Sequence, residues 1–194
     1  IPQFAQMEGI QGYGADINKS FVEGSRENLQ YTHQLMQIDL ARETYKQRIK
    51  HVAIKDIQDE FSTDWFDGIA TEPVLLPFYH EPPTVESAET TLQNEVLPLY
   101  KQLFEKAVLL LKPNARLALV SPIIETKDKN KIALPILSAG EEAGLKPLQL
   151  LQSNRLNIYT RPRFEIPPGG FKTVYDSGSK FVTREFCLFQ KPKK

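Results

Sequence analysis

Cysteine is almost absent from this chain of 194 residues, since Cys187 is the single one. One cysteine excludes a disulfide within the chain and indicates a reducing compartment, which we expect to be the cytoplasm. The chain also lacks any apolar run close to the roughly 18 residues that a membrane-spanning helix needs. No signal-peptide pattern opens the sequence. These absences exclude a disulfide-stapled secreted domain and predict a cytoplasmic protein without a membrane partner.

An excess of charge of either sign is missing as well. Lys plus Arg and Asp plus Glu both number 24, so the formal net charge is zero. This balance argues against a protein whose whole surface attracts nucleic acid, although it is compatible with a local basic face. The histidines (His33, His51 and His80) are dispersed and have no partners at metal-ligand spacing, so we expect no metal site. The terminal cluster from Lys191 to Lys194 could touch phosphates, although we expect it to be solvated surface.

Strand-like and helix-like segments alternate along the chain. Strands are expected at 10–17, 51–54, 66–70, 116–120, 148–151 and 181–190. Helices are expected at 3–8, 19–29, 84–111 (kinked or divided at Pro98) and 131–143, closed by Gly144. Residues 31–50 fit a helix or an irregular crossover. The alternation predicts an α/β fold with a mostly parallel sheet. The last two strands, joined by a loop-like stretch at 152–180, predict an antiparallel edge hairpin.

The most informative stretch is 66–78, in which a short apolar strand runs into Thr71, Glu72 and Pro73. Ligands of open α/β sheets bind just beyond the carboxyl ends of the strands. A carboxylate at that place, followed by a proline that stiffens the chain, is a candidate for holding a polar substrate. The alternative interpretation of Glu72 is a capping carboxylate in a structural loop.

Two aspartates stand at comparable places earlier in the chain. Asp16 lies at the end of the strand expected at 10–17, and Asp56 follows the strand expected at 51–54. The residues themselves are compatible with a turn or helix-capping role for Asp16, because a helix follows it, and with an exposed position in a charged loop for Asp56. The ligand-binding roles weighed against these come from the family resemblance described next.

The order of these motifs resembles that of the class I S-adenosylmethionine-dependent methyltransferases, and within them most closely the tRNA guanosine-N2 methyltransferases that modify position 10. Five segments carry the resemblance: Gly-Tyr-Gly-Ala-Asp-Ile-Asn (12–18), Lys-Asp-Ile (55–57), the Thr-Glu-Pro loop (71–73), Leu-Lys-Pro-Asn-Ala-Arg-Leu (111–117) and Phe-Val-Thr-Arg-Glu-Phe (181–186). It covers nearly the whole chain. Their order and spacing, rather than any single motif, are what is similar.

The resemblance implies a Rossmann-like class I methyltransferase sheet. It also implies that the family's first strand and Gly-rich loop are missing, because residues 1–9 read as the helix that follows that loop. We therefore expect 1–194 to be a single but partial, N-terminally truncated catalytic domain. The Arg184-Glu185 pair, which belongs to the closing motif, is expected to be structural, and Cys187 is expected to be a core residue.

The cofactor implied by the resemblance is S-adenosyl-L-methionine. Asp16 would accept hydrogen bonds from both ribose hydroxyls, with Ile17 beside it. Asp56 would accept the adenine amino group, and Ile57 would lie against the adenine ring. Thr71 would complete this cofactor-binding set.

The implied reaction is methylation of an exocyclic amine of a base. Glu72, with Pro73, would accept the N–H bonds of the amine as it attacks the methyl sulfonium. The family has Asp or Asn here, then a second proline and an aromatic ring that stacks on the base. In this chain the corresponding positions are Val74 and Leu75, and Phe78 or Tyr79 would have to supply the ring. We expect three loop residues to contact the base: Val74, Leu75 and Phe78.

The function implied is formation of N2-methylguanosine in RNA, with tRNA as the substrate, bound through an additional upstream domain. One alternative is methylation of a base amine in DNA, since the loop chemistry is shared. The other is a non-catalytic methyltransferase-like module that binds RNA or a partner.

Overall fold

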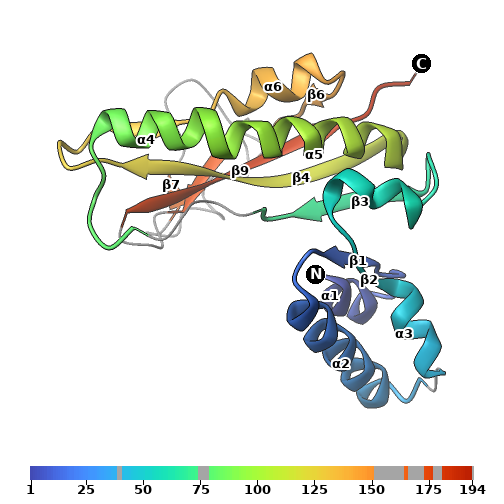
Figure 1. The fold of residues 1–194 in the computed structure, drawn as a ribbon. Helices are drawn as coiled ribbons and strands as arrows, with labels where there is room; N and C mark the ends of the chain where they lie inside the picture. Colours follow the sequence, from blue (N-terminus) through green and yellow to red (C-terminus); the bar gives the residue numbers. More distant parts are fainter. Residues whose placement is uncertain (39–40, 74–78, 151–163, 166–172, 177–180, 194) are drawn as a thin grey trace. The chain divides into compact units, whose positions relative to one another are not determined.

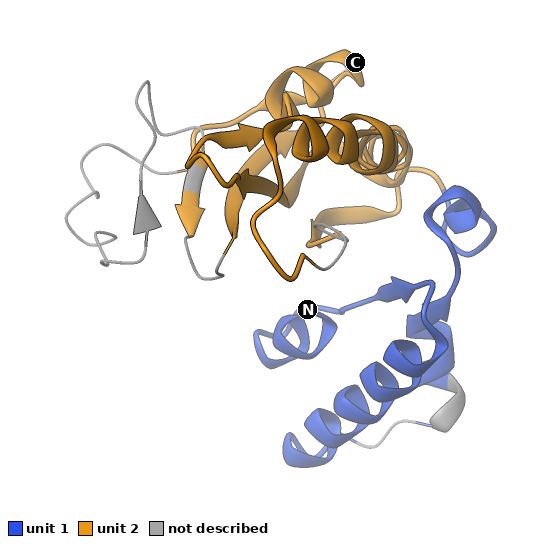
Figure 2. Cartoon of the chain, turned by 60° about the vertical axis from the view of Figure 1, so that its left-hand side comes forward, with its two compact units in different colours: residues 1–62 blue, residues 63–194 orange. Residues whose placement is uncertain are grey.

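The structure, a computed structural model, describes residues 1–38, 41–73, 79–150, 164–165, 173–176 and 181–193. The chain forms two compact units, residues 1–62 and 63–194 (Figure 2). Each unit is described by itself below. The expectation of one domain spanning 1–194 stays a prediction.

Unit 1 combines short helices with a two-stranded parallel sheet. Its elements are α1 (Pro2–Met7), β1 (Gly14–Asp16), α2 (Lys19–Leu35), α3 (Arg42–Arg48), β2 (Ile49–His51) and the 3-10 helix η1 (Ile54–Asp59). The two strands pair in parallel, with Gly14 opposite Ile49 and Asp16 opposite His51. A small apolar core forms where α2, α3 and β2 meet: Val22, Leu29, Tyr45 and Ile49. The expected strand end at Asp16 is confirmed.

The strand expected at 10–17 is longer than the observed β1, because its first half packs on α1. The Ile10 amide donates to the Ala5 carbonyl oxygen at 2.8 Å instead of entering a ladder. At Gly12 a Cβ atom would lie 2.7 Å from the Pro2 carbonyl oxygen, so only glycine allows this close approach. The expected bounds of the second strand were also wrong, since β2 ends at His51 and 54–59 form a 3-10 helix.

Unit 2 is a larger mixed sheet with helices. Its helical elements are α4 (Val85–Thr91), the π-helical segment η2 (Leu92–Val96), α5 (Leu97–Leu110) and α6 (Ile136–Glu142). Its strands are β3 (Phe66–Thr71), β4 (Leu111–Glu125), β5 (Lys131–Ala133), β6 (Lys146–Pro147), β7 (Phe164–Glu165), β8 (Thr173–Asp176) and β9 (Val182–Gln190). The strand order is β3-β4-β9-β8-β7, with β5 beside β4 and β6 beside β9.

The mixed α/β class is confirmed, and the parallel pairing is observed for β1 with β2 and for β3 with β4. The antiparallel part comprises β5 to β9 and is larger than the edge hairpin expected. β9 lies inside the sheet, paired with β4 from Arg116↔Gln190 to Ile124↔Val182 and with β8 on its other side.

The helices α4, α5 and α6 lie on one side of β4 and β9 (Figure 1). Along β9 the residues that face them are buried, whereas the alternate residues are partly exposed. Phe189 stacks edge-on against Phe104 of α5, with ring centroids 5.2 Å apart. Cys187 is buried in the same layer, which confirms its expected place in the core.

Prolines set two helix boundaries in unit 2. Pro98 falls in the first turn of α5, directly after the π-helical segment η2, so the helix type changes next to the proline. The expected division into two helices is not observed, because the backbone stays helical from α4 through η2 into α5. The helix expected at 131–143 begins only after Pro135, and 131–133 form β5 instead, because a turn at 126–130 folds the chain back onto β4. Gly144 follows α6 with φ +92°, the left-handed conformation expected of a C-terminal cap.

Two expectations for the last third of the chain were wrong. The strand expected at 148–151 is observed earlier, as β6, and Leu151 lies outside the described residues. The stretch 152–180, expected to be loop-like, contains β7 and β8 among its described residues. Their assignment rests on pairing, because Phe164 lies opposite Asp176 and Thr173 lies opposite Cys187, and such pairing cannot be read from the sequence of the segment.

Candidate functional site

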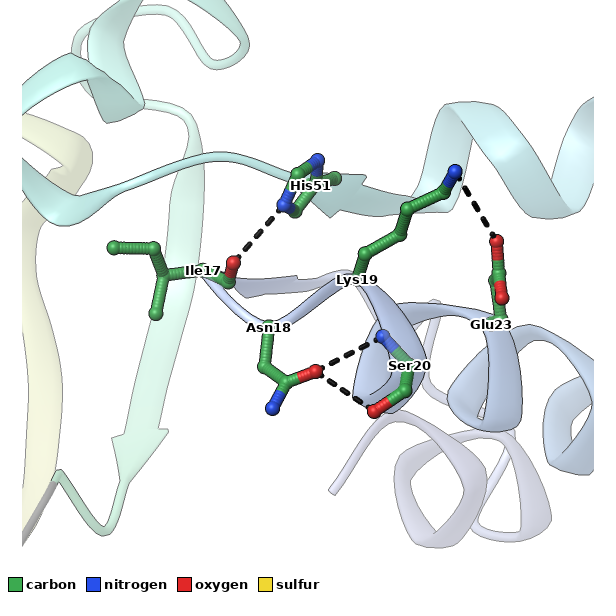
Figure 3. Close-up of polar contacts among 6 residues, drawn as sticks. All are labelled: Ile17, Asn18, Lys19, Ser20, Glu23 and His51. Atoms are coloured by element: carbon green, nitrogen blue, oxygen red, sulfur yellow. Dashed lines mark hydrogen bonds and ion pairs between the residues drawn. The ribbon is translucent and has the colours of Figure 1, made fainter.

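In unit 1 the candidate residues lie at the carboxyl ends of β1 and β2. The Asn18 amide donates to Asp16 Oδ1 at 2.7 Å, so this carboxylate orders the turn that leads into α2. Ile17 is 73 % exposed, and its carbonyl oxygen accepts a hydrogen bond from His51 Nε2 at 2.9 Å (Figure 3). The turn role considered for Asp16 is confirmed. Its role at the ribose hydroxyls stays a prediction.

The cap of α2 comes from Asn18 rather than from Asp16. Asn18 Oδ1 accepts from the Ser20 amide at 2.9 Å and from Ser20 Oγ at 2.7 Å, and Lys19 lies 3.9 Å from Glu23 one turn further on (Figure 3). The Ile17 side chain points away from this hydrogen-bonded group. The loop after β1 is therefore fixed by contacts between near neighbours in the chain, together with the hydrogen bond from His51 to the Ile17 carbonyl oxygen.

Asp56 and Ile57 lie in η1, directly after β2. Asp56 is exposed, with its carboxylate 3.9 Å from Lys55 Nζ. Ile57 is only 5 % exposed, so little of its surface is available to an adenine ring. The cofactor roles of both residues stay predictions.

In unit 2 Glu72 directly follows β3, and Arg184 of β9 reaches it. Arg184 Nε donates to Glu72 Oε1 at 2.8 Å. Arg184 Nη1 lies 3.8 Å from Asp176 Oδ2 of β8. The Glu72 side chain is 43 % exposed, whereas that of Asp176 is 5 % exposed. One guanidinium thus lies between two carboxylates, one open to solvent and one buried.

The neighbours of Glu72 differ in how well they match the expectations. Thr71 ends β3, opposite Leu119 of β4, and Pro73 is half-buried. Tyr79 OH donates to Thr91 Oγ1 at 3.0 Å and its ring packs on the core, so this ring is anchored to α4. The base-contacting residues expected in the loop lie outside the described residues: Val74, Leu75 and Phe78.

A second polar group lies on the opposite, helix-covered face of β9. Glu185 is 7 % exposed, and burial raises its pKa to about 7 despite a hydrogen bond from the Thr173 side chain. Ser121, fully buried, lies directly opposite Glu185 on β4. Within the described part of the chain, Glu185 Oε2 and Ser121 Oγ have no hydrogen-bond partner. Burial likewise raises the pKa of Tyr100, whose hydroxyl donates to the Val120 carbonyl oxygen at 2.8 Å.

The described residues contain no group of three or more His, Cys, Asp or Glu side chains that could hold a metal ion. Among the helices that the structure describes, none is long and apolar enough to cross a membrane.

No family model and no curated protein matches the chain. Among solved structures, a proposed sarcosine dimethylglycine methyltransferase from Galdieria sulphuraria matches 97 % of this chain and 72 % of its own, at 16 % identity and TM-score 0.50. The [4+2]-cyclase SpnF matches 100 % of this chain and 71 % of its own, at 10 % identity and TM-score 0.50. The chain has a Rossmann-like methyltransferase fold. Because one of these proteins is a cyclase, the fold does not by itself define the reaction.

The chain spans about half the length of another match, a proposed DNA modification methylase from Thermus thermophilus. The match covers 73 % of this chain and 51 % of that chain, at 15 % identity and TM-score 0.41.

Sequence reasoning missed the contact of Arg184 with Glu72 and Asp176. Arg184 was expected to be structural, and Asp176 fell in a stretch expected to be loop-like. The sequence does not reveal the register in which β8 pairs with β9, and it is this register that places Asp176 directly opposite Arg184. The expectation for the terminal lysines was wrong for Lys191, because its Nζ binds Asp64 Oδ1 and the Leu111 carbonyl oxygen, each at 2.7 Å.

Proposed function

We propose that this protein is an S-adenosylmethionine-dependent N-methyltransferase that acts on the exocyclic amine of guanine in RNA, with tRNA as the substrate. The observation that carries the proposal is the position of Glu72. Its half-exposed carboxylate directly follows a parallel strand of a Rossmann-like methyltransferase fold, at the edge where such sheets bind ligands.

The chemistry of Glu72 suits an amine nucleophile. The lone pair of an exocyclic amine is delocalised into the base, so the nitrogen must become pyramidal before it attacks the methyl sulfonium. A carboxylate that accepts an N–H bond favours this change and stabilises the positive charge that develops on nitrogen. Alignment of the amine with the methyl group supplies a further part of the rate.

The cofactor part of the proposal rests on unit 1. Asp16 Oδ1 is bound to the Asn18 amide, and in the proposal Oδ2 accepts from the ribose of S-adenosylmethionine. Ile17, exposed beside it, supplies an apolar surface for the cofactor. Ile57, Asp56 and Thr71 are assigned to the same cofactor by resemblance alone.

The RNA part of the proposal includes an additional RNA-binding domain as a partner. The chain carries equal numbers of acidic and basic residues, so it supplies no excess of cations for phosphate contacts. In the proposal the target base is turned out of its stack, so that its exocyclic amine reaches Glu72.

Nucleoside analysis after reaction tests the proposal. The protein is incubated with methyl-labelled S-adenosylmethionine and, separately, with unmodified tRNA and with duplex DNA, and each polymer is digested to nucleosides. We expect label in N2-methylguanosine from tRNA. Label in a DNA nucleoside would instead support the alternative of a DNA base methyltransferase. Cofactor binding without transfer to either polymer would contradict an enzymatic function and favour the non-catalytic module.

A further inference from the structure

The contacts of Arg184 connect three strands at the edge of the sheet where β3 ends. In the β9 ladders Arg184 lies opposite Pro122 of β4 and opposite Asp176 of β8. Directly opposed residues of an antiparallel pair project to the same face, so the side chains of Arg184 and Asp176 share a face of the sheet. Because its backbone is paired with β4 on one side and with β8 on the other, the main chain of Arg184 is fixed in the sheet.

The two carboxylates that Arg184 contacts differ in exposure. Asp176, at 5 % side-chain exposure, is shielded from water and lies 3.8 Å from Nη1. Glu72, at 43 %, is open to solvent and accepts from Nε at 2.8 Å through Oε1. The buried carboxylate of Asp176 therefore holds the Arg184 guanidinium in place. The guanidinium in turn holds the exposed carboxylate of Glu72. Among the described residues this contact occupies Oε1, which leaves Glu72 Oε2 for a ligand.

We propose that Arg184 is a positioning residue for Glu72 in the proposed methyl transfer, and that Asp176 positions Arg184. Arg184 fixes Oε1 so that Oε2 points at a single place for the substrate amine. The inference rests on the proposed function, and it also defines the chemical class of group that binds there. The oxygen left for the ligand, Oε2, belongs to a carboxylate that accepts hydrogen bonds and repels anions, which favours an N–H donor over a phosphate.

A purely structural role for Arg184 makes different predictions. The pair of Arg184 with Glu72 is partly exposed and contributes about 0–1 kcal/mol to stability, so in a purely structural role its loss would hardly affect turnover. Replacing Arg184 also removes a partner of the buried Asp176 and lowers stability, so kcat is compared at a temperature at which every variant is folded. A positioning role predicts a loss of turnover, because misplacing a reacting group by about 1 Å can cost on the order of 100-fold in rate.

The chain offers a matched control in the pair of Lys112 with Asp67. Lys112 Nζ lies 2.7 Å from Asp67 Oδ1, and the pair joins β4 to β3 near the amino-terminal ends of these strands. Lys112→Gln therefore removes an exposed ion pair of similar length from the same sheet, at the edge remote from Glu72.

The first experiment compares Arg184→Gln, Arg184→Lys, Asp176→Asn and Lys112→Gln in methyl transfer to tRNA. For Arg184→Gln we expect kcat to fall about 10- to 100-fold with unchanged affinity for S-adenosylhomocysteine. Arg184→Lys and Asp176→Asn should lose less, and Lys112→Gln should lose nothing. For Arg184→Ala, millimolar guanidinium should restore part of kcat, which a misfolded variant would not show. Unchanged kcat in Arg184→Gln would overturn the inference.

A second measurement does not depend on activity and separates failure of the inference from failure of the proposed function. With carboxyl-labelled glutamate, the Glu72 carbon signal is assigned from its loss in Glu72→Gln. Arg184→Gln should shift this signal, and Lys112→Gln should leave it in place. No shift would overturn the inference even in an active enzyme. A shift in a protein that transfers no methyl group would support the contact and refute the proposed function.

Discussion

The two carboxylates at the centre of this account, Asp16 in unit 1 and Glu72 in unit 2, are held in opposite ways. Each stands at or just after the carboxyl end of a parallel strand. Asp16 binds the amide of Asn18, two residues away, whereas Glu72 binds the side chain of Arg184, 112 residues away. The first carboxylate is fixed by its own loop, and the second depends on the pairing of β9 with its neighbours.

This difference suggests a division of roles. A carboxylate held by its own loop is a fixed hydrogen-bond acceptor that needs no contact from distant parts of the chain, which suits binding of a cofactor. A carboxylate held across the sheet can be oriented and charge-balanced by other strands, which suits a reacting group.

The largest effect is expected from Phe189→Ala in unit 2. Phe189 is fully buried against Phe104, and loss of such a ring costs about 3–5 kcal/mol in free energy of unfolding. Hydrogen exchange should show lost protection in unit 2 and little change in unit 1. As the counterpart, Leu29→Ala should lower protection in unit 1 alone. Equal losses in both units for either variant would break the comparison, since the units would then unfold together.

Rising pH should affect the two units with opposite sign. Burial raises the pKa of Glu185 from 4.5 to about 7, so the folded unit 2 binds this proton more tightly and loses stability as pH rises through that range, by about 3 kcal/mol in total. Burial, with Arg48 nearby, lowers the pKa of His33 below 6.5, so unit 1 loses stability as pH falls below 6.5. Hydrogen exchange corrected for intrinsic rates, followed from pH 4.5 to pH 8, checks both slopes.

Glu185→Gln is the control for this pH dependence. Its amide carries no charge and can donate to Ser121 Oγ, so unit 2 should be more stable than the wild type at pH 8 and should lose its dependence between pH 4.5 and 7. A slope that survives in this variant would show that another group titrates.

A smaller effect is expected from Asp16→Ala on cofactor binding. Loss of hydrogen bonds to a charged acceptor should weaken S-adenosylhomocysteine binding about tenfold, equivalent to about 1.4 kcal/mol. The value of kcat at saturating cofactor should be unchanged. Calorimetric titration checks the affinity. A fall in kcat with unchanged affinity would reverse the roles assigned to Asp16 and Glu72.

The smallest effect is expected from Asn18→Ala. Asn18 Oδ1 caps α2 through the Ser20 amide, and loss of such a cap costs about 1 kcal/mol of unfolding free energy. Asn18→Asp keeps the acceptor and serves as the control. Thermal denaturation followed by circular dichroism measures both variants, and equal losses in the two would show that the cap is not the cause.

The same contrast explains what could be predicted from the sequence. The end of β1 at Asp16, the turn before α2 and the cap at Gly144 follow from local chemistry and are confirmed. The mixed α/β class followed from the alternation of longer segments. The contact of Arg184 with Glu72 could not be predicted, because it depends on strand register across 112 residues and on the pairing of β8 with β9.

The most direct test of the account measures cofactor affinity and methyl transfer together in Glu72→Gln. We expect S-adenosylhomocysteine to bind this variant as tightly as the wild type in a calorimetric titration, whereas methyl transfer to tRNA falls by about 100-fold or more. Transfer that persists at the wild-type rate would contradict the central claim that the carboxylate following β3 carries the reaction.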